Sequence, residues 1–227
     1  MCWATYLGIV PYELALDLQE RLKRARAEDE VPDVLLLLQH PPVFTLGRFR
    51  GENDWLIPPE ALAREGIAIF QTDRGGGLTY HGPGQLVGYP ILDLQKNSLG
   101  VREYIQRLEK VVLELLLSWG VAGYRVPQYP GVWAEGKKVC SIGIHVSRFI
   151  TTHGFALNVN NDLCYFDYIR PCGLRGGLIT SLSELLGHPV EVESLLEGLL
   201  HCFSTSFGLN CQWQELQWLA ASGSLSG

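Results

Sequence analysis

The sequence predicts an α+β fold, with a central mixed or largely antiparallel sheet flanked by helices, in one domain over residues 1–227. Apolar runs typical of buried strands mix irregularly with amphipathic helical segments, instead of alternating in strict strand–helix pairs. No internal repeat, linker or shift in composition divides the chain. Its 47% apolar and 19% charged residues are typical of a globular protein with a substantial core.

The N-terminal segment is predicted to form a strand and a long helix. Hydrophobic periodicity predicts a strand over 3–10 and a helix over 11–27 that has a proline in its first turn. Leu14, Leu18 and Leu22 recur at helical spacing, so we expect them to form the buried stripe of that helix.

Two strands and a short helix are predicted next. A continuous apolar run over 34–39 is typical of a buried strand. The turn His40-Pro-Pro follows, and we expect His40 to cap it. The chain then resumes as a strand over 43–47, and a proline near its start favours a short helix over 59–65.

The second half is predicted to contain the best helix of the chain, over 100–119, where apolar residues follow helical spacing. A hairpin is expected from 131–135 and 138–146, and another strand from 155–159. Further predictions follow: a helix capped by Ser181 and Glu184, an amphipathic helix over 194–207 that buries Cys202, and a frayed tail over 220–227.

Composition excludes several classes of function. The net charge of −6 argues against general nucleic-acid binding. We recognise no signal peptide and no apolar run of about 18 residues, so no membrane association is expected. The cysteines have no CxxC or regular spacing, which favours reduced thiols in the cytoplasm and no metal site. They are Cys2, Cys140, Cys164, Cys172, Cys202 and Cys211.

A glycine-rich stretch from Arg74 to Pro90 is the best candidate for ligand binding. Five of its first eleven residues are glycine, which is used where backbone takes positive φ or approaches another group closely. It lies between the apolar runs 67–70 and 86–92, so we expect one long loop held by strands at both ends. Its polar side chains are those of Arg74, Thr79, Tyr80, His81 and Gln85.

Cys172 is the best nucleophile candidate among the six cysteines. It lies in a Pro-Cys-Gly turn between Arg170 and Arg175, whose positive charge favours the thiolate. A structural thiol under a turn is the alternative. A nucleophilic cysteine needs a base or a cation that lowers its pKa, and His81, His153 and Lys138 are all candidates, since sequence spacing cannot choose among groups that meet in space.

Taken together, these segments resemble the lipoyl(octanoyl) transferase family of lipoate biosynthesis, over roughly residues 5–205. The tail over 213–227 lies outside the resemblance. The motifs that carry it are His-Pro-Pro-Val-Phe-Thr-Leu-Gly-Arg (40–48), Arg-Gly-Gly-x-x-Thr-Tyr-His-x-x-Gly-Gln (74–85), Gly-x-Lys-Val-x-Ser-Ile-Gly (136–143), His-Gly-Phe-Ala-Leu-Asn-Val (153–159) and Pro-Cys-Gly (171–173).

The resemblance implies the fold of biotin and lipoate protein ligases, related to class II aminoacyl-tRNA synthetases. It implies that octanoyl-acyl carrier protein donates its octanoyl group, without a cofactor. The acceptor would be a lysine on the lipoyl domain of a 2-oxoacid dehydrogenase E2 subunit or of the glycine-cleavage H protein. A monomer is expected.

The resemblance also implies roles for particular residues. Cys172 corresponds to the acyl-thioester nucleophile, and Lys138 to the residue that lowers its pKa. Lys138 is preferred to Lys137 from the family motif alone. Backbone N–H groups of Gly75–Gly77 or of a turn at Gly143 are candidates to hold an oxyanion. The implied walls of the acyl pocket are Arg74, Gly75, Gly76, Gly77, Leu78, Thr79, Tyr80, His81, Ser141, Ile142, Gly143, Gly154, Phe155 and Ala156.

Some alternatives remain open at this stage. An ATP-dependent lipoate or biotin protein ligase would share the fold, and a non-catalytic acyl-binding module would share the pocket; a Cys–His hydrolase is a further alternative. Cys140, two residues from Lys138, is expected on the same strand face as a spectator thiol.

Because an acidic carrier would be repelled by a chain of net charge −6, we expect a local basic patch at the pocket rim. Its candidates are Arg48, Arg148, Arg170 and Arg175.

Overall fold

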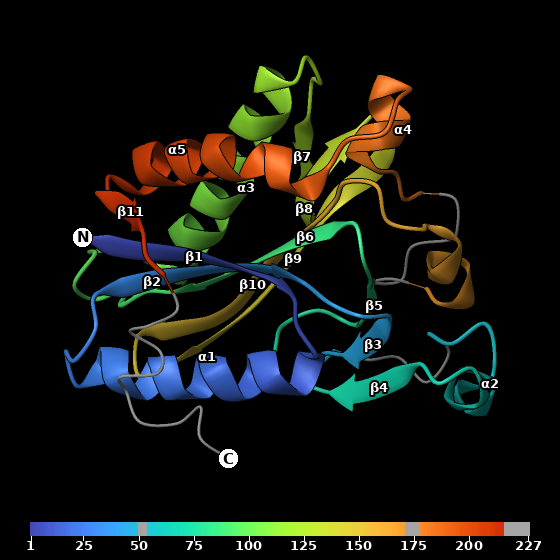
Figure 1. Cartoon of the computed structure of the whole chain (residues 1–227), viewed down its shortest axis with the longest axis horizontal. Coiled ribbons are helices and arrows are strands. Elements are labelled where there is room, and N and C mark those ends of the chain that lie inside the picture. Colours follow the sequence, from blue (N-terminus) through green and yellow to red (C-terminus); the bar gives the residue numbers. More distant parts are fainter. Residues whose placement is uncertain (50–53, 171–177, 216–227) are drawn as a thin grey trace.

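The computed structural model describes residues 1–49, 54–170 and 178–215, which form a main sheet of eight strands (Figure 1). The strand order is β11-β1-β2-β6-β10-β9-β8-β7. β1 is parallel to β2 and β11, and the other neighbours are antiparallel, so the prediction of a mixed sheet is confirmed. The strands are β1 (Cys2–Ile9), β2 (Asp33–Gln39), β6 (Gln85–Ile91), β7 (Tyr124–Val126), β8 (Tyr129–Ala134), β9 (Lys137–Ser147), β10 (Ile150–Asn158) and β11 (Cys211–Trp213).

A smaller sheet of three strands lies beside the main one. It consists of β3 (Val43–Leu46), flanked by β4 (Ala68–Gln71) and β5 (Leu78–His81). The prediction of one long glycine-rich loop is wrong, because residues 78–81 pair with β3 as an antiparallel strand. β5 divides the glycine-rich stretch into two short connections.

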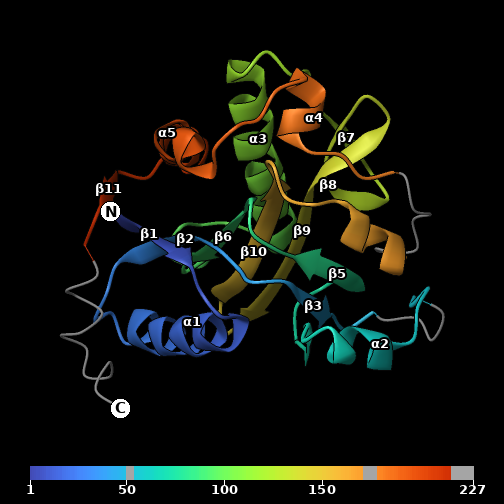
Figure 2. The same ribbon diagram turned by 45° about the vertical axis from the view of Figure 1, so that its right-hand side comes forward.

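Helices cover both faces of the main sheet. α3 and α5 lie on one face and α1 on the other, and α2 lies beside the small sheet (Figures 1 and 2). The largest apolar cluster fills the space between α3, α5 and the sheet, and a second lies under α1. Among the described helices, none is both long and apolar enough to cross a membrane. The α-helices are α1 (Tyr12–Ala27), α2 (Pro59–Arg64), α3 (Val101–Ser118), α4 (Leu182–Leu186) and α5 (Leu196–Phe207).

Most of the predicted elements are confirmed. The Ser181 hydroxyl accepts a hydrogen bond from the Glu184 N–H (3.2 Å) at the start of α4, and Cys202 is buried on α5. β10 begins at Ile150, before its predicted start, because Arg148 and Phe149 turn the chain directly out of β9 with φ of 48° and 66°. β11 was not predicted, and the tail over 220–227 lies outside the described residues.

The predicted stripe of α1 is confirmed at Leu22 and at Leu18, which packs against the core, but is wrong at Leu14. Leu14 is 61% exposed, and the buried face instead includes Ala15, Gln19, Leu22 and Arg26. Gln19 accepts a hydrogen bond from a backbone N–H of β10, and Arg26 binds a carboxylate of β2. Tertiary partners therefore decide which face of this helix is buried.

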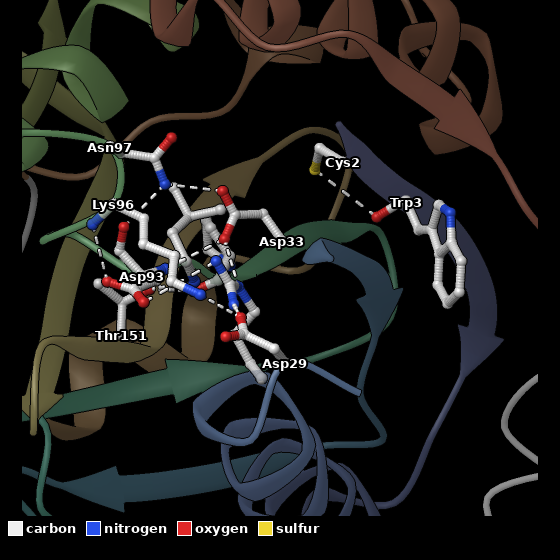
Figure 3. Close-up of polar contacts among 11 residues, drawn as sticks. Cys2, Trp3, Asp29, Asp33, Asp93, Lys96, Asn97 and Thr151 are labelled. Carbon is white, nitrogen blue, oxygen red and sulfur yellow. Dashed lines mark hydrogen bonds and ion pairs between the residues drawn. The ribbon is translucent and has the colours of Figure 1, made fainter. Parts of the chain in front are cut away.

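Arg26 is the centre of a largely buried polar cluster at one end of the sheet, which we call the arginine node. Figure 3 shows its partners Asp29 and Asp33, together with Asp93 and Asn97. The Arg26 Nε donates to Asp33 (2.7 Å), and the Arg26 Nη1 donates to Asp29 (2.8 Å). The other Asp33 oxygen accepts from the Asn97 amide (2.7 Å), and the Asp93 backbone N–H also donates to Asp33 (3.1 Å). The node thus joins the end of α1 to the start of β2 and the end of β6.

Candidate active site

A narrow cavity of ≈ 40 Å³, here called the acyl slot, lies between the main sheet and the glycine-rich segment. Its floor is a block of small residues on two neighbouring strands. Ser141 of β9 lies directly opposite Ala156 of β10, and Gly143 lies opposite Gly154. Small residues at four adjacent positions leave space above the sheet for a thin ligand.

Two of these floor glycines are required by close backbone approach. A Cβ added at Gly154 would lie 2.2 Å from the Gly88 carbonyl oxygen, and one added at Gly143 would lie 2.8 Å from the Gly75 carbonyl oxygen. Both distances are below the contact limit for carbon and oxygen, so a side chain would force the backbone apart. Gly143 lies within β9 and not in a turn, so its expected role as a turn donor to an oxyanion is wrong.

Arg74 holds the glycine-rich segment on the small sheet. Its guanidinium donates to the Thr45 carbonyl (2.7 Å) and hydroxyl (2.8 Å), and also to the Gly75 carbonyl (3.0 Å). The Gly75 N–H donates to the Ile144 carbonyl of β9 (2.8 Å), which ties the segment to the main sheet. This bond occupies one of the three N–H groups expected to hold an oxyanion.

Gly76, which lines the slot, and Gly77, which lines a neighbouring cavity, keep N–H groups available. In the part of the chain that the structure describes, neither N–H donates to a backbone acceptor. Their carbonyls, in contrast, accept from Phe49 and Gly47, respectively (both 3.0 Å). The segment is therefore held in place through its carbonyl oxygens, which is an arrangement suited to presenting N–H groups to an anion.

β5 divides the candidate wall residues between two environments, because side chains alternate along a strand. Thr79 and His81 line the slot. Leu78 and Tyr80 point to the other side, where they join a separate apolar cluster and Tyr80 stacks on Tyr165 at 4.6 Å. The expectation that Leu78 and Tyr80 form slot walls is therefore wrong.

The structure separates Lys138 from Lys137. Lys137 is exposed, whereas Lys138 is 3% exposed and lines the slot. The Lys138 backbone is bound on both sides: its N–H donates to Leu178 (2.7 Å), and its carbonyl accepts from Thr180 (3.0 Å). The lysine chosen from the motif is thus the buried one.

A β-bulge sets the direction of the Lys138 side chain. The ladder between β8 and β9 pairs Val132 with Cys140 but Trp133 with Lys138, so Val139 is an extra residue in β9. Val139 and Cys140 are both fully buried in the core under α3. The expectation that Cys140 shares a face with Lys138 is therefore wrong, because the bulge shifts the alternation by one residue. Burial raises the pKa of the Cys140 thiol to about 12, as expected for a spectator.

Cys172 and Arg175 lie outside the described residues. The chain is described up to Arg170, whose N–H donates to the Asp54 carbonyl (2.7 Å), and again from Leu178, beside Lys138. None of the five described cysteines lines the slot. In the same part of the chain, no group of three or more His, Cys, Asp and Glu side chains is placed to hold a metal ion.

Two buried histidines next to the slot are held in the neutral form. His81 Nδ1 donates to the Gln85 side-chain oxygen (2.7 Å), and burial lowers the pKa of His81 well below its usual range. His40 Nδ1 donates to the Val10 carbonyl (2.7 Å) and its Nε2 accepts from the Tyr89 hydroxyl (2.8 Å). His40 is therefore not a turn cap, and burial lowers its pKa to about 4.

His153 occupies the end of the slot away from Lys138. It pairs with Ile144, six residues along β9 from Lys138, which corresponds to about 20 Å of strand. Its Nε2 donates to Asp73 (2.8 Å), and this hydrogen bond lowers the pKa of Asp73 to about 2. Its Nδ1 is buried and has no partner among the described residues, and its φ of 57° is in the left-handed region. His153 and Lys138 therefore both line the slot, from positions six residues apart in the register of β9.

Several slot residues were not predicted. Tyr12, Val87 and Tyr89 line the slot from α1 and β6, and Asp73 and Gln19 orient His153 from outside it. Tyr12 directly follows the helix-starting proline, and Tyr89 lies in an apolar run. The sequence pattern therefore predicts a core position for each of them and not a site position. Gly77, also a candidate wall, lines the neighbouring cavity instead. The remaining candidate walls do line the slot: Arg74, Gly75, Gly76, Thr79, His81, Ser141, Ile142, Gly143, Gly154, Phe155 and Ala156.

Comparison with solved structures defines the fold class. Lipoate-protein ligase A bound with ATP superposes with a TM-score of 0.74 at 15% identity, covering 98% of this chain and 93% of that one. Biotin protein ligase from Aquifex aeolicus, in complex with biotin and ATP, gives a TM-score of 0.55 at 17% identity. The match covers 92% of this chain and 71% of that one. The fold is therefore that of the lipoate and biotin protein ligases, as the sequence motifs imply.

Sequence comparison defines the family. The model of the lipoyl protein ligase A/B catalytic domain matches residues 11–204, and this chain belongs to that family. An octanoyltransferase of Caldicellulosiruptor saccharolyticus is 47% identical over 205 residues, which are 89% of this chain and 87% of the relative. An octanoyltransferase of Myxococcus xanthus is 44% identical over 207 residues, 88% of this chain and 58% of the relative. Within the family, the chain is thus an acyltransferase.

Proposed function

We propose that the protein transfers an octanoyl group from octanoyl-acyl carrier protein to the lysine of a lipoyl domain, through an acyl-thioester on Cys172. The observation that supports this most strongly is the position of Lys138. Its buried side chain lies at one end of a narrow slot whose floor is made of small residues. A buried ammonium beside a slot for an apolar chain is suited to holding a thiolate.

In the first step, the Cys172 thiolate attacks the carbonyl carbon of the donor thioester. A carbon–sulfur bond to Cys172 forms, the carbon–sulfur bond to the carrier breaks, and the carrier leaves as a thiolate that takes a proton from the Lys138 ammonium. Because one thioester replaces another, the step is nearly balanced in free energy and needs no ATP. The proton that Lys138 held next to Cys172 moves to the leaving group.

In the second step, the amine of the acceptor lysine attacks the acyl-enzyme. A carbon–nitrogen bond forms and the bond to Cys172 breaks. Lys138, now neutral, takes the proton that the attacking amine must lose. The product is an amide, which is more stable than a thioester, so the second step drives the overall transfer and no cofactor is required.

The developing oxyanion in both steps needs hydrogen-bond donors. The N–H groups of Gly76 and Gly77 are the candidates, since the Gly75 N–H already donates to Ile144. The carbonyl bonds of Gly76 and Gly77 to the segment after β3 hold both peptide groups in place before substrate binds. Preorganised donors of this kind stabilise a transition state without a cost of reorganisation.

Sequence separation supports a meeting of Cys172 with Lys138. Leu178, six residues after Cys172, is hydrogen-bonded to the backbone of Lys138. Six residues of extended chain span at most about 20 Å, so the chain length allows a thiol at position 172 to reach the lysine.

The proposed acceptors are the lipoyl domains of 2-oxoacid dehydrogenase E2 subunits and of the glycine-cleavage H protein, and the proposed state is a cytoplasmic monomer. One solved structure of similar fold is a bi-partite lipoate protein ligase and its E2 lipoyl domain, from Thermoplasma acidophilum. Because E2 subunits carry the acceptor domain in that system, they are the first acceptors to test.

The test is the intact mass of the protein after incubation with octanoyl-acyl carrier protein in the absence of ATP. We expect an octanoyl adduct that hydroxylamine removes, absent from Cys172→Ser and slow to form in Lys138→Ala. Transfer that occurs only with free octanoate and ATP would instead identify an ATP-dependent ligase. In that case Cys172 would be a structural thiol.

A further inference from the structure

A second cavity of ≈ 400 Å³ adjoins the acyl slot, and we call it the edge groove. It is lined along β9 by Lys138, Ile142 and Ile144, and also by Ile105 of α3 and the exposed Phe49. The groove and the slot lie side by side and share five lining residues, among them Lys138. These are Gly75, Gly76, Lys138, Ile142 and Gly143.

The groove exists because β9 continues beyond the strand that pairs with it. The β8–β9 ladder ends where Gly131 pairs with Ser141, and one further step in register sets Pro130 opposite Ile142. Proline has no N–H, so the ladder bond to the Ile142 carbonyl cannot form. The second half of β9 is therefore an edge on this side, and residues 142–147 are half-buried instead of buried.

The direction of the backbone at this edge is known from one bond. The Ile144 carbonyl accepts from Gly75, which lies on the side away from β10. N–H and C=O groups of one strand residue point the same way and alternate along the strand, so the Ile142 carbonyl also points into the groove. The groove thus combines apolar side chains with a backbone acceptor, which suits a thin apolar chain that carries amides.

The dimensions select the kind of occupant. The lining residues on β9 lie between Lys138 and Ile144, six residues apart, which is at most about 20 Å of strand because the bulge at Val139 shortens it. A lysine side chain alone is much shorter than this, and a two-stranded protein hairpin, with strands about 5 Å apart and side chains on both faces, is too wide for a cavity of ≈ 400 Å³. A single extended arm with the contour of about four residues fits both limits.

We infer that the edge groove binds the pantetheine-type arm of the thioester donor, an extended chain of methylene groups interrupted by two amides and ending in a phosphate. The inference rests on the proposed function, since it requires a donor whose acyl group enters the slot at Lys138. The thioester sulfur lies where slot and groove meet, the acyl chain enters the slot, and the arm follows β9 outward.

The outer end of the groove has the charge that such an arm requires. Arg48 directly precedes Phe49, is exposed, and forms no ion pair with the described residues. Phe49 itself is 78% exposed, the highest value among the exposed large apolar side chains. An apolar side chain next to a free guanidinium matches an apolar arm that ends in a phosphate.

The inference is tested with two donors that share the octanoyl thioester and differ in the arm. One is octanoyl-pantetheine phosphate and the other is octanoyl-N-acetylcysteamine, which lacks the outer amide and the phosphate. The rate of acyl-enzyme formation gives kcat/KM for each donor. We expect the full arm to be favoured by at least about tenfold, because binding of a non-reacting part of the substrate lowers the barrier relative to free enzyme.

Two variants locate the effect. Phe49→Ser removes the exposed wall, and Ile105→Trp narrows the groove; in both, the ratio of the two kcat/KM values is expected to fall toward one. The matched control is Phe149→Ser, since Phe149 is also exposed (58%) but lies in the β9–β10 turn, at the other end of β9 from Lys138. In this control the ratio stays that of the wild type.

The outcomes separate the inference from the proposed function. Acylation by both donors at equal rates, or a ratio that Phe49→Ser and Ile105→Trp leave intact, would overturn the inference alone. A defect of these variants only with the acceptor domain would assign the groove to the acceptor and also overturn it. If neither octanoyl thioester acylates the protein, the proposed function fails and the inference fails with it.

Discussion

The arginine node and the acyl slot both bury polar side chains, but they treat them in opposite ways. In the node, the Arg26 guanidinium and the Asp33 carboxylate bind each other, and the remaining Asp33 oxygen is bound by Asn97 (Figure 3). Beside the slot, His153 Nδ1 and Gln19 Nε2 are buried without a partner in the described chain. The donors and acceptors of the node bind one another, whereas some buried donors and acceptors of the slot region have no partner in the described chain.

The difference has an energetic meaning. A buried donor or acceptor without a partner costs about 1–3 kcal/mol, while a buried charge pair is stable only when all its members are present. The node is therefore expected to contribute to stability and not to catalysis. The residues around the slot are expected to show the reverse, with large effects on transfer and small effects on unfolding.

The largest expected effect is that of Lys138→Met on transfer. Methionine keeps much of the apolar stem that packs over Gly131 but removes the ammonium. We expect kcat/KM for octanoyl transfer to fall by about a thousandfold, as for loss of a group that transfers protons. Steady-state transfer to a lipoyl domain measures it. The control is Lys137→Met, which removes an exposed neighbour and should stay within about twofold of the wild type.

The second largest effect is expected on the free energy of unfolding, in the variant Arg26→Met. The substitution leaves Asp33 buried and short of its main partner, so the free energy of unfolding should fall by about 3–5 kcal/mol. Urea unfolding measures this, and Arg24→Met, at an exposed position of the same helix, should change it by less than about 0.5 kcal/mol. A loss of transfer per folded molecule in Arg26→Met would break the contrast between node and slot.

The third effect depends on pH and concerns Asp73, which binds His153 and also lies 3.3 Å from His145. Its pKa is lowered from 3.8 to about 2, so its contribution to stability is present above pH 3.8 and is lost as pH falls toward 2. Because Asp73 is about half exposed, we expect only about 1 kcal/mol after screening by solvent.

Urea unfolding of the wild type and of Asp73→Asn between pH 6 and pH 3 measures the Asp73 contribution. The stability difference between the two proteins should be largest at pH 6 and should narrow as the pH falls. A difference that stays constant, or that widens toward pH 3, would contradict the assignment of the lowered pKa to the His153 hydrogen bond.

The smallest expected effect is that of Arg48→Glu on the donor. A rim charge acts mainly on association, so kcat/KM for octanoyl-acyl carrier protein should fall about three- to tenfold at low salt and less at 0.5 M salt. The control is Arg148→Glu. Arg148 was a candidate for the same basic patch, but it follows the far end of β9, about 30 Å of strand from Lys138. Equal effects of the two variants would mean that net charge, and not a local patch, controls docking.

The local pattern of the sequence predicted the regular elements well and their exact faces less well. α3 was predicted because its apolar spacing is sustained and its buried side is almost entirely apolar. α1 was predicted as a helix, but its buried face was only partly predicted, because Gln19 and Arg26 are buried through partners on β10 and β2. A polar residue that finds its partner in a distant strand leaves no signal in helical periodicity.

The candidate site was predicted in composition but not in orientation. The motifs identify Lys138 and the small floor residues, yet the bulge at Val139 that turns Lys138 toward the slot depends on its register with β8. In the same way, Leu78 and Tyr80 leave the slot because residues 78–81 pair with β3. Strand register is a property of two segments together, so a one-dimensional reading of either segment does not contain it.

The parallel neighbours of β1 have a consequence for synthesis of the chain. β1 is made before the other described strands and is paired on one side by β2, but its other edge is covered by β11, where Cys2 lies beside Cys211. More than two hundred residues must therefore leave the ribosome before that edge is closed. Until then, β1 presents an open strand edge on the nascent chain, which is a site for unwanted pairing between neighbouring chains on one messenger RNA.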